Sequence, residues 1–170
     1  MRDEDELISV KLTRGTSELM AITRHGLSIR FPESDVRDMG RSAMGVKGVT
    51  LNPDDSVIAL DIVEENAELL VISEKGFGKR TPLSEYRVQS RGGKGIKTSN
   101  ITGKTGYLVG AKVVKDDCEV MLISAEGIII RMAIDGISVM GRSTQGVTLM
   151  KLAENDSVVA LAKIVPDEEC

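Results

Sequence analysis

The chain has 170 residues, 41% of them apolar, and a net charge of −4. This length and composition indicate a globular protein with a real core. With two Phe, two Tyr and no Trp, the sequence argues against a platform of stacked aromatic rings for single-stranded nucleic acid. The negative net charge also counts against a nucleic-acid partner, unless the basic residues are gathered in one region.

The sequence predicts neither a membrane segment nor a metal or disulfide site. No apolar run approaches the ~18 residues that span a bilayer, and no signal peptide opens the chain. The cysteines Cys118 and Cys170 are isolated, which favours a reducing cytoplasm. We therefore expect a cytoplasmic protein that needs no cofactor. His25 lies in a predicted turn, and we expect no catalytic role for it.

A repeat of about 50 residues organises the sequence. Segments "SELMAITRHGLSIRF" from Ser17, "AELLVISEKGFGKRT" from Ala67 and "CEVMLISAEGIIIRM" from Cys118 align at offsets of 50 and 51 residues. Self-similarity at such a period is typical of repeat architectures. It predicts three complete repeats, at about residues 17–66, 67–117 and 118–166.

Each repeat predicts the same elements in the same order. A continuous apolar run, such as Leu69–Ile72, suits a strand covered on both faces, although periodicity alone does not exclude a buried helix. A glycine-containing turn and a second strand ending in Arg then form a hairpin. A glycine-rich segment follows, and a strand-like run closes the repeat. Residues 1–14 look like the closing strand of a preceding repeat.

These elements predict an all-β fold of propeller-like blades. About four short strands per repeat, stacked so that both faces are covered, are typical of propeller blades. No segment has the sustained 3.6-residue period of a helix. We expect residues 1–170 to form one such unit, with three complete repeats and a leading strand.

The glycine-rich segments, residues 39–46, 89–96 and 140–147, share two recurring positions. These are an arginine and a glycine, namely Arg41, Arg91 and Arg142, and Gly45, Gly95 and Gly146. The recurring glycines favour a turn required by the fold. The arginines either contact an anion or cap carbonyls and pair with acids inside each blade. The arginines that end the second strands, Arg30, Arg80 and Arg131, are interpreted as solvated edge charges.

The middle segment, "QSRGGKGI", lies in a strongly basic region. Between Glu74 and Lys104 there are eight basic residues and two acids, a local charge of +6 in a chain of net charge −4. Such segregation is what a one-sided surface for a polyanion needs. Gly92 and Gly93 serve either as a turn alone or as a place where backbone N–H groups approach phosphates.

"QSRGGKG" resembles the box motif of the bacterial DNA gyrase A-type protein, whose pattern is Gln, basic, Arg, Gly, Gly, basic, Gly. The phrases "GLSIRFPESDVRDMGRSAMGVKG" and "GIIIRMAIDGISVMGRSTQGV" resemble neighbouring blades of the C-terminal domain of gyrase A. The sequence departs from the family pattern in two ways: Ser90 stands where the family has a basic residue, and the box lies in a middle repeat instead of the first of about six blades. Both departures suggest a C-terminal fragment made of the later blades of that domain, in which the primary box is absent. The equivalent protein of topoisomerase IV has similar blades.

The resemblance implies a β-pinwheel, a propeller-like disc whose basic rim wraps duplex DNA. Such a domain is not catalytic; it supports ATP-dependent negative supercoiling by a holoenzyme made of gyrase B together with the rest of gyrase A. The implied location is the cytoplasm, at the nucleoid. An alternative is a propeller that binds a basic protein through acidic patches.

The expected contacts are to the DNA backbone, independent of base sequence. Arginine grips a phosphate in a bidentate way and lysine acts as a point charge. The candidate DNA-binding residues are Gln89, Arg91, Gly92, Gly93, Lys94, Gly95, Lys97, Arg41, Lys47, Arg142, Lys79 and Arg87.

Overall fold

The computed structural model describes residues 6–164, which form strands and three short 3₁₀ turns without any α-helix, so the all-β prediction is confirmed. No helix in this part of the chain could therefore cross a membrane. The strands are β1 (Glu18–Thr23), β2 (Leu27–Pro32), β3 (Val57–Ile62), β4 (Glu68–Ser73), β5 (Phe77–Pro82), β6 (Ile96–Lys97), β7 (Leu108–Val114), β8 (Glu119–Ser124), β9 (Ile129–Ala133), β10 (Val147–Thr148) and β11 (Val158–Ile164). The turns are η1 (Glu33–Asp35), η2 (Leu83–Glu85) and η3 (Ile134–Gly136).

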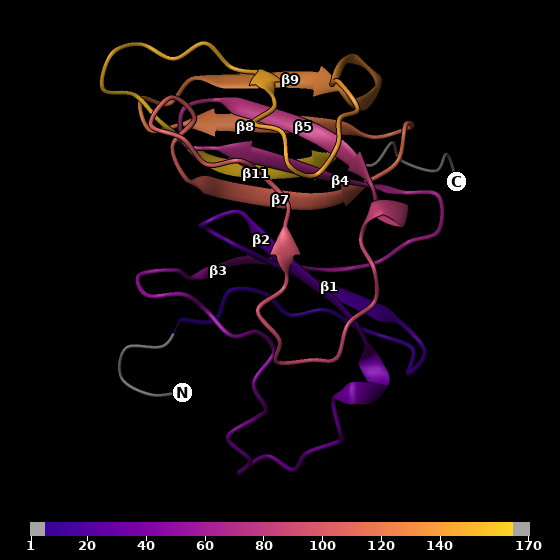
Figure 1. The fold of residues 1–170 in the computed structure, drawn as a ribbon. Coiled ribbons are helices and arrows are strands. Elements are labelled where there is room, and N and C mark those ends of the chain that lie inside the picture. Colours follow the sequence, from indigo (N-terminus) through magenta and orange to yellow (C-terminus); the bar gives the residue numbers. More distant parts are fainter. Residues whose placement is uncertain (1–5, 165–170) are drawn as a thin grey trace.

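The strands form three antiparallel sheets, blades 1 to 3, which are stacked in chain order (Figure 1). Their strand orders are β3-β1-β2-β6, β10-β5-β4-β7 and β11-β8-β9. The first strand of each hairpin thus lies between its hairpin partner and the closing strand. The closing strands β3, β7 and β11 lie next to one another and form the inner side of the stack. We call the opposite side, which carries β2, β5 and β9, the rim.

The fourth strand of a blade comes from the following repeat. β6 pairs with β2 through Leu27–Lys97 and Ser28–Ile96, and β10 pairs with β5 in the same way. The glycine-rich segments of the second and third repeats therefore lie on the rim of the preceding blade (Figure 1). The sequence predicted about four strands per blade, but not that one of them crosses to a neighbour.

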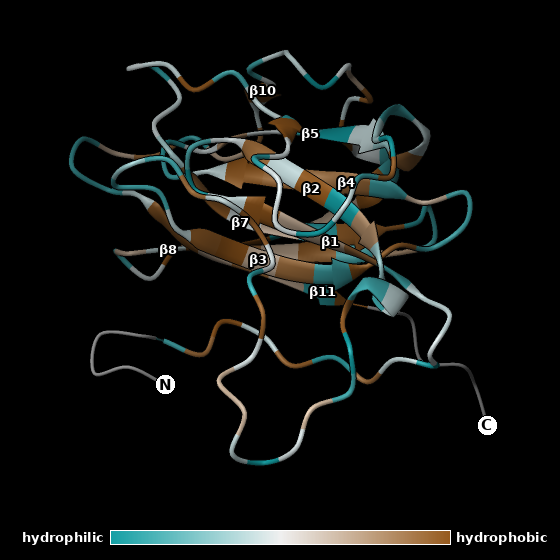
Figure 2. Cartoon of the chain, turned by 60° about the horizontal axis from the view of Figure 1, so that its bottom comes forward, coloured by the Kyte–Doolittle hydropathy of each residue, from teal (hydrophilic) through white to brown (hydrophobic). Residues whose placement is uncertain are grey.

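The core lies between the blades and is mainly aliphatic, with Tyr86 as an aromatic member; the strands that border it are coloured as largely hydrophobic in Figure 2. Residues Leu69–Ile72 of β4 are all buried, which confirms a strand covered on both faces. Met20 and Ile22 of β1 belong to one cluster with Leu69 and so join blades 1 and 2. Burial of each such side chain contributes about 1.5–3 kcal/mol.

Arginine side chains also connect successive blades. Arg30, in the second half of β2, forms an ion pair with Glu18 across its own hairpin. Its Nη1 then donates to the carbonyl oxygens of Leu83, at 2.8 Å, and Tyr86, at 3.2 Å. Both acceptors belong to the next repeat, at η2. Arg30 therefore joins blade 1 to the turn that follows the second hairpin.

Arg80 makes the same connection between blade 2 and the third repeat. It pairs with Glu68 at 2.7 Å, and its Nε donates to the carbonyl of Ile137 at 2.8 Å. Its side chain is only 7% exposed. The prediction of solvated edge charges is thus wrong for Arg30 and Arg80, because a following repeat covers them. Arg131, which pairs only across its own hairpin in the described part of the chain, is 59% exposed.

The leading segment differs from the expected strand. Residues 6–14 form no strand, and residues 1–5 lie outside the described residues. Both edges of β1 are taken by β2 and β3, so the segment pairs with no strand of blade 1, and its expected place as the closing strand of a preceding blade stays a prediction. The segment nevertheless runs beside β3, where Ser9 Oγ donates to the Leu60 carbonyl at 3.4 Å and Lys11 pairs with Asp61 at 2.8 Å.

Gly95 tests the crossing of the second glycine-rich segment. Its φ is +78°, and a Cβ there would collide with the backbone oxygen of Ser28 in β2. We expect Gly95→Ala to lower the free energy of unfolding by about 2 kcal/mol or more, measured by denaturant titration. Gly103→Ala is the matched control, since nothing lies within 4 Å of its Cβ position. Equal effects of the two changes would contradict the assigned register.

Arg80 and Arg131 test the connection between blades, since they occupy the same repeat position. Arg80→Ala leaves the carboxylate of Glu68 without its buried partner, and we expect a loss of about 3–5 kcal/mol in unfolding free energy. Arg131→Ala removes an exposed pair and should cost less than about 1 kcal/mol. Thermal or denaturant unfolding measures both. Similar losses would show that Arg80 does not connect the blades.

Candidate nucleic-acid interface

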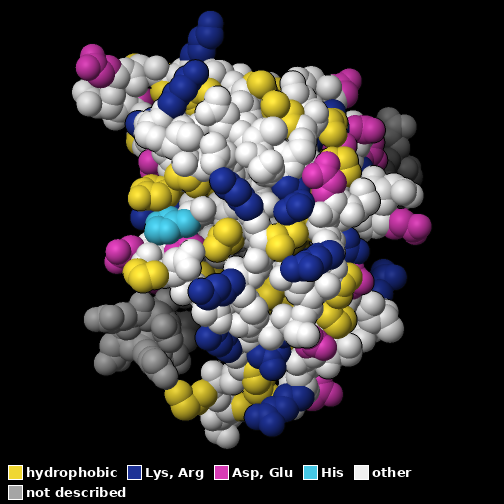
Figure 3. All heavy atoms as spheres, in the orientation of Figure 1, with side chains coloured by type: hydrophobic (Ala, Val, Ile, Leu, Met, Phe, Trp, Pro, Cys, Tyr) yellow, Lys and Arg dark blue, Asp and Glu magenta, His cyan; other side chains and the backbone are white. Residues whose placement is uncertain are grey.

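Exposed basic side chains gather on the loops around the rim. In the view of Figure 3, which faces β6 and the rim, Lys and Arg side chains follow the surface from top to bottom, and many of the visible Asp and Glu side chains lie toward its sides. The segregation of charge seen in the sequence is therefore also spatial. The exposed candidates from the first two repeats are Arg41, Lys47, Arg87, Lys94 and Lys97.

The second glycine-rich segment is held against residues 47–50 by its backbone. The amide of Gly92, whose φ is +84°, donates to the carbonyl of Gly48 at 2.8 Å. Thr50 donates its amide to the Gly93 carbonyl at 2.8 Å and its hydroxyl to the Gly92 carbonyl at 2.6 Å. The Gly92 amide is thus occupied by the fold and not presented to solvent, whereas Gly93 itself is exposed.

Arg91 stabilises this segment from one side. Its amide donates to the carboxylate of Asp35 at 3.1 Å, and its Nε donates to the carbonyl of Asp35 at 3.0 Å. Its Nη1 donates to the carbonyl of Lys47. Of the two interpretations of the recurring arginine, the structure thus shows carbonyl capping. The half-buried side chain still brings a positive charge to the rim beside Lys47 and Lys94.

Arg142 makes the equivalent contacts one blade further on. Its amide donates to the Glu85 carboxylate at 3.2 Å, and its Nη1 donates to the Lys97 carbonyl at 3.1 Å. The guanidinium also lies 5.9 Å from the centre of the Tyr86 ring. An acid of the 3₁₀ turn and an arginine of the next glycine-rich segment thus form a repeated clamp. Asp35 and Glu85 lie 50 residues apart, a spacing from which they could have been found.

Lys79 is not on the surface, so its assignment as a DNA contact is wrong. It is 1% exposed, and its Nζ donates to the carbonyls of Gly141, at 2.6 Å, and Arg142, at 2.7 Å. The pKa of Lys79 is lowered to about 8, chiefly by burial; the charge of Glu85 opposes this shift and that of Arg142 adds to it. The reason for the error is that β5 is covered by the third glycine-rich segment, which the sequence alone did not place there.

The remaining candidates differ in accessibility. Gln89 is half-buried, and its Nε2 has no hydrogen-bond partner in the structure. Gly95 is required by the pairing with β2 and has a structural role. Lys97 is exposed, and its Nζ donates to Asn100 Oδ1 at 2.7 Å. Arg41 is exposed in the first glycine-rich segment, which no described blade receives.

The structure adds basic groups that no motif indicated. Lys104 lies 5.3 Å above the Phe77 ring, at the start of the strand that pairs with β10. Arg24 lies 4.3 Å above the Tyr107 ring, on which His25 stacks at 4.8 Å. Lys104 belongs to the basic region that the sequence shows between Glu74 and Lys104, but only the tertiary fold brings it beside the rim strands.

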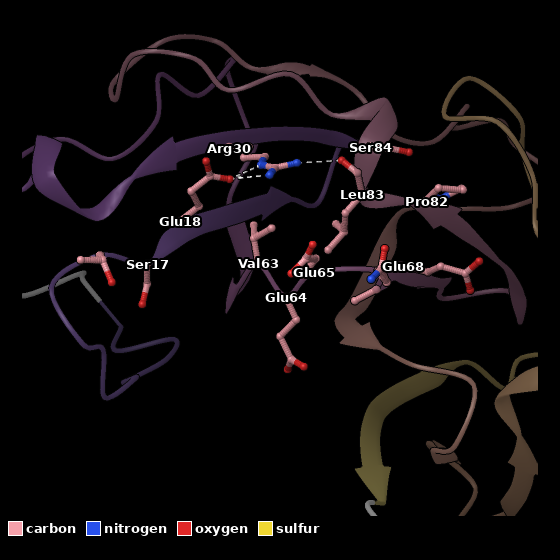
Figure 4. A pocket seen from close by; sticks show the side chains of 13 residues that line it. Ser17, Glu18, Arg30, Val63, Glu64, Glu65, Glu68, Pro82, Leu83 and Ser84 are labelled. Carbon is pink, nitrogen blue, oxygen red and sulfur yellow. Dashed lines mark hydrogen bonds and ion pairs between the residues drawn. The ribbon is translucent and has the colours of Figure 1, made fainter.

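An acidic cavity of about 740 Å³ opens between blades 1 and 2 (Figure 4). It is relevant to the alternative of a protein-binding propeller. Most of its carboxylates already have partners, since Glu18, Glu64 and Glu68 pair with Arg30, Lys115 and Arg80. Within residues 6–164, no group of three or more side chains is placed to hold a metal ion, in this cavity or elsewhere. The cavity therefore offers little free negative charge to a basic partner.

Comparison with known proteins identifies the class of this fold. The family model described as the DNA gyrase C-terminal domain, beta-propeller, matches residues 17–64, 67–115 and 119–164. The chain belongs to this family.

Curated relatives point to gyrase A in particular. The chain is 63% identical to the gyrase A protein of Halalkalibacterium halodurans and 48% identical to that of Clostridium acetobutylicum, over 99% of its own length. It spans about 20% of the length of these relatives.

Solved structures share the fold. A DNA gyrase A C-terminal domain superposes with a TM-score of 0.90 at 29% identity, over 96% of this chain and 56% of that one. The C-terminal domain of a DNA topoisomerase IV superposes with a TM-score of 0.92 at 24% identity, over 97% of this chain and 52% of that one. The second likeness shows the fold alone.

The lowered pKa of Lys79 predicts a pH-dependent stability. Below pH 8 the side chain is protonated in both folded and unfolded states, and its burial cost is fully present. Between about pH 8 and its ordinary value of 10.5 the folded state loses the proton first, so the free energy of unfolding rises, by up to about 3 kcal/mol. Denaturant titrations should show this rise relative to Lys79→Met. Parallel pH profiles for the two proteins would contradict it.

Proposed function

We propose that the chain is a non-catalytic domain that binds and wraps duplex DNA as part of a DNA gyrase A protein. Two observations carry this proposal. Exposed Lys and Arg side chains form a band on the rim, and the same arginine clamp occurs on successive blades. Arg91 and Arg142 hold two neighbouring loops in equivalent positions. Basic groups thus recur at the spacing of the blades, on one side of the disc.

The expected binding mode is electrostatic. DNA carries one charge per about 1.7 Å of helix axis, and lysines that neutralise phosphates release counterions. Lys94 and Lys97 are exposed, and contacts of this kind position DNA without reading its sequence. Contacts on successive blades would offset the energy of bending the duplex around the rim.

The remaining steps of the reaction belong to other parts of the enzyme. In this proposal the rest of gyrase A cleaves DNA, gyrase B hydrolyses ATP, and the holoenzyme introduces negative supercoils in the cytoplasm, at the nucleoid. The equivalent domain of topoisomerase IV is the second candidate. The near-complete box of residues 89–95 and the identities of 63% and 48% to gyrase A proteins favour gyrase.

The exposed lysines of the second segment provide the test. We expect the double change Lys94→Ala and Lys97→Ala to weaken binding to a random-sequence duplex severalfold and to reduce the slope of log affinity against log salt by about one to two. Salt-titrated mobility shifts measure both quantities. Arg91 is less suitable, because its change would also release residues 47–50.

A double variant of Lys112 and Lys115 is the matched control. These residues lie on and just after the inner strand β7, so their change to Ala removes the same charge away from the rim. Equal losses for both double variants, or binding that salt does not affect, would contradict the rim as the DNA surface. Ligation of nicked plasmid in the presence of the chain tests wrapping, because wrapped DNA changes its linking number.

A further inference from the structure

Lys79 occupies a position that is apolar in both sibling blades. The equivalent residues are Ile29 in β2 and Ile130 in β9. Lysine is almost never buried to this degree without partners, and Lys79 is 1% exposed. A charged residue on the inward-facing side of a rim strand therefore calls for an explanation other than contact with DNA.

The ammonium of Lys79 is directed at the third glycine-rich segment. Its Nζ donates to the carbonyls of Gly141 and Arg142 and lies 3.1 Å from Thr144 Oγ1. Three oxygen atoms of one loop thus converge on a single side chain. An amine keeps N–H donors whether or not it is protonated, so the anchoring does not require the charge.

The corresponding site in blade 1 is built differently. There Ile29 offers no donor, and the loop approaches it through Gly93, whose Cβ position would lie 3.5 Å from Ile29 Cδ1. At the position of Gly93, the third segment has Thr144. The strand residue and the loop residue thus differ together between the two blades. In blade 1 an isoleucine packs near a glycine, whereas in blade 2 a lysine donates to a threonine hydroxyl and two carbonyls.

We propose that Lys79 is a positioning residue, which fixes the third glycine-rich segment so that Arg142 is presented at the rim. This inference rests on the proposed DNA-binding function. The amide and guanidinium of Arg142 are held from outside by Glu85 and the Lys97 carbonyl. Lys79 holds its carbonyl from inside. Removal of the inner anchor takes the Lys79 donor from both carbonyls; the Gly141 carbonyl still accepts from Thr144, whereas the Arg142 carbonyl loses its side-chain donor, and the segment opens more often.

Hydrogen exchange of single amides tests the anchor without DNA. Lys79→Met keeps the volume and matches the apolar siblings, so the blade should remain folded. We expect the amides of Arg142 and Thr144 to exchange about tenfold faster in this variant, while those of Gln89 and Gly92 in the second segment are unchanged. Lys79→Gln, which retains two N–H donors, should give an intermediate rate. Unchanged exchange at Arg142 and Thr144 would overturn the proposal.

A double-mutant cycle tests the link to DNA. We expect Lys79→Met and Arg142→Ala each to weaken duplex binding about threefold, and the double variant to be no weaker than Arg142→Ala, because Lys79 acts through Arg142. Lys112→Met controls for the loss of one charge. Additive effects, or no effect of Lys79→Met, would overturn the positioning role. If the unmodified chain bound no DNA, the proposed function would fail, while hydrogen exchange would still decide whether Lys79 anchors the loop.

Discussion

The crossing of each glycine-rich segment onto the preceding blade is the constraint on which the rest of the structure depends. It completes the outer edge of blades 1 and 2 with β6 and β10. It also brings the carbonyls of η2 and η3 within reach of Arg30 and Arg80. Neighbouring blades are consequently joined by main-chain pairing and by buried arginines, in addition to their apolar contacts. The same crossing carries the basic loops to the rim.

A chain of net charge −4 carries exposed basic side chains along its rim, while several of the acids that the structure describes are engaged in ion pairs and hydrogen bonds. Glu18 and Glu68 pair with arginines inside the blades, and Asp35 and Glu85 accept amides from the glycine-rich segments. Asp35 and Glu85 stabilise the loops from exposed positions, where each accepts the amide of a neighbouring arginine and so offsets less of the charge of the lysines. Net charge is therefore a poor guide to the partner of such a protein, whereas the location of the charges is informative.

The sequence predicted individual contacts less well than the fold. Repeat alignment placed Arg30 and Arg80 at the end of a strand, where an exposed edge charge is the usual outcome, yet both are covered by the next repeat. Lys79 was assigned to the surface for the same reason. The equivalent residues Ile29 and Ile130 are apolar, which indicates that this position faces inward.

The sequence by itself determined the period of the repeat, the apolar first strands, the turns at glycine and the resemblance of "QSRGGKG" to the gyrase box. These features are local, because strand formation and turn conformation depend on residues close in the chain. Only the tertiary structure decided which blade receives each glycine-rich segment, and hence which basic side chains are buried or exposed. That outcome depends on which strand edge is open and which carbonyls need donors, and both belong to segments about 50 residues away.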